Sequence, residues 1–178
     1  MKKKTIALIV CLTLIIGCAI GGTIAWLTDK TEAVTNTFTV GDVDITLAES
    51  PNLDLKMVPG KTITKDPTVT VVKDSEACWL FVKVEKSANF DTFMTYEMAD
   101  GWTELTGVDG VYYRQVNTLT SDQTFSVLKN NNVTVKNTVT KAMLNAEGFT
   151  APTLTFTAYA CQLASFNDPA LAWAEVSK

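Results

Sequence analysis

The chain has few residues of the types that usually carry out catalysis. None of its 178 residues is histidine, which excludes Ser-His-Asp triads and zinc-peptidase motifs of the His-Glu-x-x-His type. The sequence also contains no Gly-x-Ser-x-Gly elbow and no phosphate-binding glycine loop. We therefore expect no catalytic residue, no bound cofactor and no metal site, and we interpret the protein as one that is not an enzyme.

The acidic residues are the remaining candidates for cation binding. Asp100, Asp109 and Asp122 could hold a cation only if the fold brought them together, because the spacing typical of a calcium loop is absent. Most other carboxylates lie at expected turns or on polar strand faces. We expect them to be solvated.

Two cysteines, Cys78 and Cys161, lie outside the apolar N-terminal segment. A secreted protein can form a disulfide between such a pair. Cys78 shares a strand face with its apolar neighbours, whereas Cys161 lies on the face opposite those of its own strand. Without a bulge the two sulfur atoms would not meet, so a disulfide and two buried thiols both remain open.

Aromatic side chains are concentrated in the predicted strands. We expect them to pack in the core and across strands. Carbohydrate binding through exposed rings is the alternative for Trp102 and Tyr113. The set comprises Trp79, Phe81, Trp102, Tyr112, Tyr113 and Tyr159.

The N-terminus has the features of a secretion signal. Lys2, Lys3 and Lys4 precede an uncharged run, residues 5–27, which contains the small residues of a cleavage site at Thr23-Ile24-Ala25. This pattern predicts a signal peptide over residues 1–25, with cleavage between Ala25 and Trp26. Two alternatives remain: a retained membrane anchor, since the run is long enough to span a bilayer, or lipidation at Cys18.

The charge of the remaining chain limits its partners. Cleavage after Ala25 removes three lysines and no acid, which leaves 12 basic and 19 acidic residues, a net charge of −7. An acidic chain without a basic cluster argues against nucleic acid and against an anionic membrane surface. We expect a secreted protein, extracellular or at the cell surface, that contacts a membrane only through an uncleaved signal.

Residues 26–178 read as a single all-β domain with one or two short helices, preceded by the N-terminal signal helix. In the segment "ACWLFVKVE", Cys78, Leu80, Val82 and Val84 alternate with Trp79, Phe81, Lys83 and Glu85, so both strand faces are at least partly covered. The last long strand, "TLTFTAYACQ", alternates in the same way. Asp109-Gly110 predicts a hairpin tip, and residues 130–132 are expected to separate two short strands.

Two segments near the C-terminal end predict short helices. The first is "TKAMLNAEG", which we expect to end at Gly148. In the second, "NDPALAWAEV", Asp168 is a candidate N-cap and Pro169 suits the first helical position. Trp173 would pack this second helix against the sandwich.

Two stretches resemble the TasA/camelysin family. The first, "GGTIAWLTDKTEAVTNTFTVGDVDITLAE", is similar to the signal and mature start of family members that a SipW-type signal peptidase processes. The second, "MVPGKTITKDPTVTVVKDSEACWLFVKVE", is similar to the family's Pro-Gly turn followed by a lysine and two strands. The matching positions are Gly21, Gly22, Ala25, Trp26, Leu27, Asp29, Phe38, Gly41, Val43, Asp44, Ile45, Pro59, Gly60 and Lys65.

The resemblance implies a jelly-roll-like β-sandwich, secretion by the SipW-type peptidase and assembly of identical subunits into extracellular biofilm-matrix fibres. Camelysin-type members have been described as metalloproteases, an activity that the absence of histidine argues against here. We therefore compare a polymerising matrix protein with an anchored cell-surface binding module or adhesin. A secreted metalloprotease is the third reading.

The segment of residues 26–47 suits a strand that is donated to a neighbouring subunit. Trp26 and Leu27 are apolar with nothing local to cover them, and Phe38 and Val40 alternate with threonines. An extended segment can add to an exposed sheet edge of another molecule, with alternate side chains filling pockets. We expect these four residues to mediate a head-to-tail contact between copies of the chain. A terminus that is frayed or that docks on its own domain is the alternative.

Overall fold

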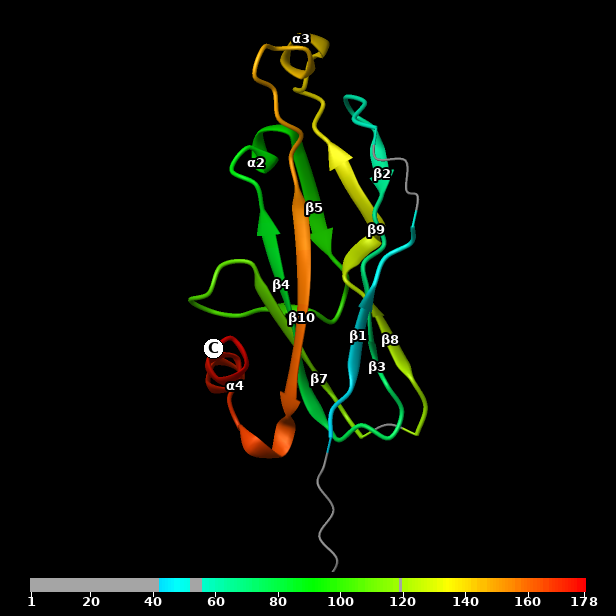
Figure 1. Cartoon of the computed structure of the whole chain (residues 1–178), viewed down its shortest axis with the longest axis vertical. Helices are drawn as coiled ribbons and strands as arrows, with labels where there is room; N and C mark the ends of the chain where they lie inside the picture. The colour runs from blue at the N-terminus through cyan, green and yellow to red at the C-terminus, as the bar shows by residue number, and fades with distance from the viewer. Residues whose placement is uncertain (1–41, 52–55, 119) are drawn as a thin grey trace, which may run out of the picture. The chain divides into compact units, whose positions relative to one another are not determined.

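Strand β4, most of whose side chains are buried, lies between β10 and β7 in the first sheet (Figure 1). The computed structural model describes residues 42–51, 56–118 and 120–178, within the unit Val40–Lys178. β4 spans Cys78–Lys86 and pairs antiparallel with β10, Leu154–Gln162, on one side and β7, Val111–Val116, on the other. β6, Thr103–Glu104, completes the order β10-β4-β7-β6. The predicted signal peptide and its cleavage site lie outside the described residues.

The second layer consists of two three-stranded antiparallel sheets. One has the order β1-β3-β8, with β1 at Ile45–Ala48, β3 at Thr68–Val71 and β8 at Gln123–Ser126. The other has the order β2-β9-β5, with β2 at Thr62–Thr64, β9 at Leu128–Val135 and β5 at Met94–Met98. The chain passes directly from one of these sheets into the other at two places, from β2 into β3 and from β8 into β9. The all-β sandwich predicted from the sequence is confirmed.

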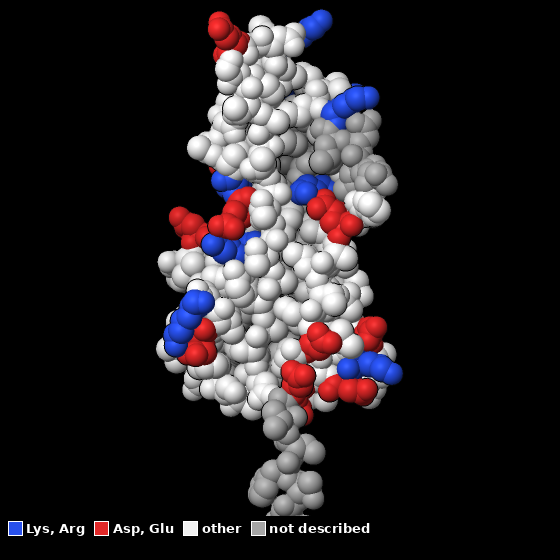
Figure 2. Space-filling model, in the orientation of Figure 1, with Lys and Arg blue, Asp and Glu red and all other residues white. Residues whose placement is uncertain are grey.

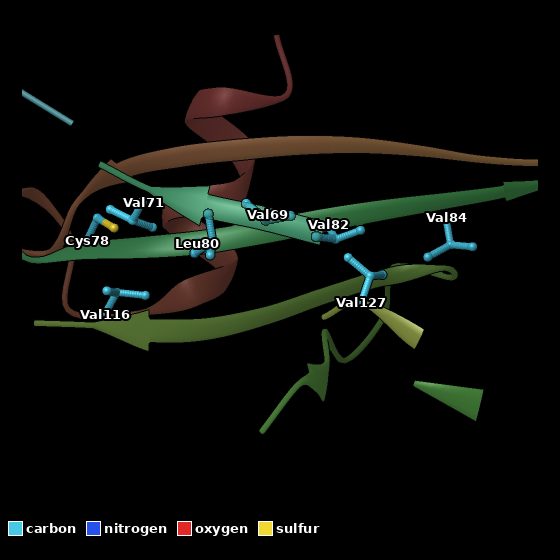
Figure 3. Close-up of a cluster of buried hydrophobic side chains, with 8 residues drawn as sticks. All are labelled: Val69, Val71, Cys78, Leu80, Val82, Val84, Val116 and Val127. Atoms are coloured by element: carbon cyan, nitrogen blue, oxygen red, sulfur yellow. The ribbon is translucent and has the colours of Figure 1, made fainter. Parts of the chain in front are cut away.

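The core lies between the layers. Val69 and Val71 of β3 face Leu80 and Val82 of β4 (Figure 3), and all four side chains are fully buried. A second cluster forms where β2, β9 and β5 meet the short helix α2, Phe90–Phe93, whose Phe90 is buried. This helix was not predicted from the sequence.

The outer face of β4 is covered by the C-terminal helix α4, Pro169–Val176. Its N-cap is Asp168, whose Oδ1 accepts a hydrogen bond of 2.7 Å from the amide of Ala170. Trp173 packs against Phe81 and Tyr159, with ring centroids 5.5 and 5.1 Å away. The prediction that Trp173 packs this helix on the sandwich is confirmed.

Two boundaries differ from those expected. Residues 130–132 do not separate two strands, because β9 runs through them and the break lies at Val127. Asn130 and Asn131 have φ values of 53° and 55° inside the strand, a conformation that asparagine adopts more readily than most residues. Helix α3, Lys141–Leu144, ends before the predicted Gly148.

Candidate strand-accepting edge

Strand β10 has one edge that is hydrogen-bonded to no described strand, although β1 lies beside it. It pairs only with β4, so its other edge is the border of the first sheet. Two hydrogen bonds lie at the ends of the ladder between β4 and β10: Ser87 N–H to Thr153 O at 3.0 Å and Leu163 N–H to Ala77 O at 2.7 Å. On the β10 side, both involve odd-numbered residues. Along an antiparallel ladder, hydrogen-bonded residue pairs alternate with pairs whose backbone groups point away from the partner strand. The amides and carbonyls of Leu154, Phe156, Ala158 and Ala160 therefore point away from β4.

The composition of this edge is unusual for an exposed border. Natural sheets commonly protect edge strands with charges, proline or a very short strand. β10 is nine residues long, "LTFTAYACQ", and contains no charged residue and no proline. In Figure 2 the surface in the middle of the view, where Figure 1 places β10, is mostly free of charged side chains. These are the properties of an edge that can pair with another strand.

A second edge that pairs with no described strand lies across from β10, on the other layer. β2 pairs only with β9, and Lys65 N–H donates to Asn131 O at 2.8 Å in the same ladder. By the same alternation, the backbone groups of Thr62 and Thr64 point outward. The side chain of Ile63 points inward and is 5% exposed.

A groove separates these edges, apolar beside β2 and of mixed polarity beside β1. One part, with a volume of about 340 Å³, is lined mainly by apolar side chains of β2, β5, β9 and α2 and by the segment that leads into β10. An adjoining part of about 300 Å³ is lined by residues of β1 and β10, including Leu47 and Phe156. Leu154 lines both parts. The groove can therefore receive apolar side chains from an added strand.

One cation lies in the groove. The Lys65 Nζ contacts both carboxylate oxygens of Glu49, at 2.8 and 3.1 Å, and lies 5.5 Å from the ring centroid of Phe156. Lys65 is one of the positions that matched the TasA/camelysin pattern. Its side chain is 14% exposed, so the pair fixes the end of β1 against β10 instead of leaving a free charge on the surface.

All of the cleavage and assembly residues predicted from the sequence lie outside the described residues: Ala25, Trp26, Leu27, Phe38 and Val40. Within the proposed arm only residues 42–47 are described. There Ile45 is half-buried against the core, and Leu47 is 37% exposed beside the groove.

The two cysteines are free thiols in the structure. Cys78 lies opposite Gln162 and Cys161 lies opposite Trp79 in the β4–β10 register, so the two side chains project from opposite faces of the sheet. Burial, with a smaller contribution from Cys161, raises the pKa of Cys78 to about 11. Burial also raises the pKa of Cys161. Both thiols are therefore protonated and weakly nucleophilic at neutral pH.

No metal site is found among the described residues, where no three Cys, Asp or Glu side chains are grouped closely enough to hold an ion. Asp100, Asp109 and Asp122 are thus not brought together. In the same part of the chain, no helix has the length and hydrophobicity needed to cross a bilayer. The aromatic residues Trp79, Phe81, Tyr113 and Tyr159 pack with α4, in agreement with the core role expected for them.

The sequence did not identify β10 as the candidate strand-accepting edge. Its alternation predicts a strand, but which edge stays free depends on a pairing with β4 that spans some seventy residues of sequence. The absence of charge from "LTFTAYACQ" was the available signal, because an edge that is meant to stay unpaired usually carries a charge.

The comparisons with known proteins add one finding. The family model described as camelysin metallo-endopeptidase matches residues 1–76, which include the N-terminal segment and strands β1 to β3. This match supports assignment to the TasA/camelysin family and a secreted or cell-surface protein. β10 lies outside the matched residues. Searches among curated proteins and among solved structures returned no match.

Proposed function

We propose that this chain, whose first 76 residues match the camelysin family, is an extracellular structural protein that polymerises into matrix fibres by strand donation. The observation that carries the proposal is the long, uncharged free edge of β10 beside an apolar groove. A SipW-type peptidase would release the arm at Trp26, and the arm would then pair with β10 of the next subunit. Such head-to-tail contacts need not close into a ring.

The chemistry of the arm fits the groove. A strand paired with β10 places alternate side chains toward the sandwich interior, where the lining is Leu154, Phe156 and Ile63. Phe38 and Val40 have this alternate spacing, and Trp26 and Leu27 supply further apolar surface. Burial of such side chains stabilises by about 1.5–3 kcal/mol each, and the edge hydrogen bonds fix the register.

Replacing Ala158 by proline tests this assembly site. The substitution removes one outward-pointing N–H of β10, and proline is tolerated on edge strands when its missing donor faces solvent. We expect folded protein that no longer forms fibres, as measured by electron microscopy and sedimentation. Ala158→Val is the matched control, because it adds similar bulk and keeps the amide. Equal fibre formation by both folded variants would refute pairing at this edge.

Peptidase activity is the second candidate function, because the matched family is described as a metallo-endopeptidase. A hydrolytic zinc site normally has histidine among its ligands, and this chain has none. We expect purified protein to show no peptidase activity that a chelator removes. Activity that is lost in chelator and restored by added zinc would establish the second candidate instead.

A further inference from the structure

Arg114 is the only arginine of the chain, and it lies in an aromatic environment at the border between the layers. It occupies β7 opposite Leu80. Its guanidinium Cζ lies 4.0 Å from the ring centroid of Phe125, on β8, and 5.4 Å from that of Trp102. The indole N–H of Trp102 donates to the carbonyl of Ser126 at 2.9 Å, which holds the ring in place.

This guanidinium has no acidic partner among the described residues. Five lysines, by contrast, form ion pairs with carboxylates: Lys65, Lys83, Lys86, Lys129 and Lys178. The Nε of Arg114 is buried and makes no hydrogen bond. Burial lowers the pKa of Arg114, and no charged neighbour contributes to that shift. A partly buried cation without a counter-ion is costly, so an additional partner would be stabilising.

The outer edge of the half-buried guanidinium is not fully enclosed. Within the described part of the chain, Nη1 and Nη2 make no hydrogen bond, and neither is among the completely buried unpartnered atoms, so each keeps some exposure to solvent. Gly101, with φ of 88°, lies beside them, and a Cβ there would be 3.0 Å from Nη2. The two Nη groups form a planar fork that matches the two oxygens of a carboxylate.

We propose that Arg114, held between Phe125 and Trp102, is the centre of a carboxylate-binding site. The aromatic rings fix the plane of the guanidinium, so little side-chain entropy is lost on binding. Two sources can present this chemistry: a free organic acid, including a uronic-acid sugar, or an acidic side chain of a second copy of this chain. The site is on the β7–β8 side of the sandwich and does not depend on strand donation at β10.

The single arginine provides a direct probe. Protein labelled with ¹⁵N-arginine gives one Nε–Hε signal, and burial of this nitrogen slows its exchange with water. We would titrate intact protein with sodium acetate and with sodium glucuronate, using sodium chloride at equal ionic strength as the control. We expect a saturable shift of the signal, on the order of millimolar in affinity, with both carboxylates and none with chloride.

A dilution series without added acid distinguishes the sources. A signal that moves with protein concentration, and that loses this dependence in saturating acetate, identifies the side chain of a second copy. A signal that responds only to added acid identifies a free carboxylate. In the variant Arg114→Lys, which keeps the charge but lacks the fork, the acetate response of the Trp102 indole signal should weaken at least about fivefold. Equal responses to chloride and to both carboxylates would overturn the site.

Discussion

Replacing Trp173 by alanine is expected to lower the free energy of unfolding by about 3–5 kcal/mol, the range for truncating a large buried aromatic side chain. The side chain is 8% exposed. It is the main contact of α4 with the sheet, through the rings of Phe81 and Tyr159. Its loss leaves the outer face of β4 partly uncovered, including Trp79 and Leu105.

Urea unfolding followed by circular dichroism measures this change. Leu171→Ala is the matched control, because Leu171 lies on the same helix and is 59% exposed, and its substitution should cost less than about 0.5 kcal/mol. Equal destabilisation by the two variants would show that α4 does not stabilise the sheet through Trp173.

Removing the arm is expected to abolish fibre formation while leaving the domain folded. The deletion covers residues 26–40, which include the four donor residues and precede the described residues, so the three buried clusters of the sandwich remain complete. Loss of the donor leaves the free edge of β10 without the strand that would pair with it. Electron microscopy and analytical sedimentation should find monomers, whereas undeleted protein forms fibres under the same conditions. Fibres that are equal in both would eliminate the arm as donor.

Patterns of neighbouring residues correctly predicted features that depend on one strand or one helix alone. The alternation in "ACWLFVKVE" predicts that Leu80 and Phe81 lie on opposite, covered faces of the strand, and the structure has Leu80 between the layers and Phe81 under α4. Asp168 and Pro169 predicted the start of α4 because capping depends on neighbouring residues. These features need no knowledge of the rest of the fold.

The candidate sites depended on contacts between distant segments. Whether β10 is an edge strand follows from the whole sheet order, which alternation does not encode. Arg114 acquires its surroundings from Phe125 of β8 and from Trp102, which precedes β6. Asn130 and Asn131, which have left-handed φ values, likewise lie in β9 where its register with β5 shifts between Leu128 and Val133, although a run of asparagines alone indicates a turn.

Amide exchange along β10 tests the central claim most directly. Protein lacking residues 26–40 would be measured alone and with an added peptide of the same residues. The amides of Phe156 and Ala158 point to the free edge, whereas those of Thr155 and Thr157 bond to β4 and serve as internal controls. Strand donation predicts that the peptide slows exchange at Phe156 and Ala158 at least about tenfold and leaves Thr155 and Thr157 unchanged. Unaltered exchange at Phe156 and Ala158 with bound peptide would contradict pairing at β10.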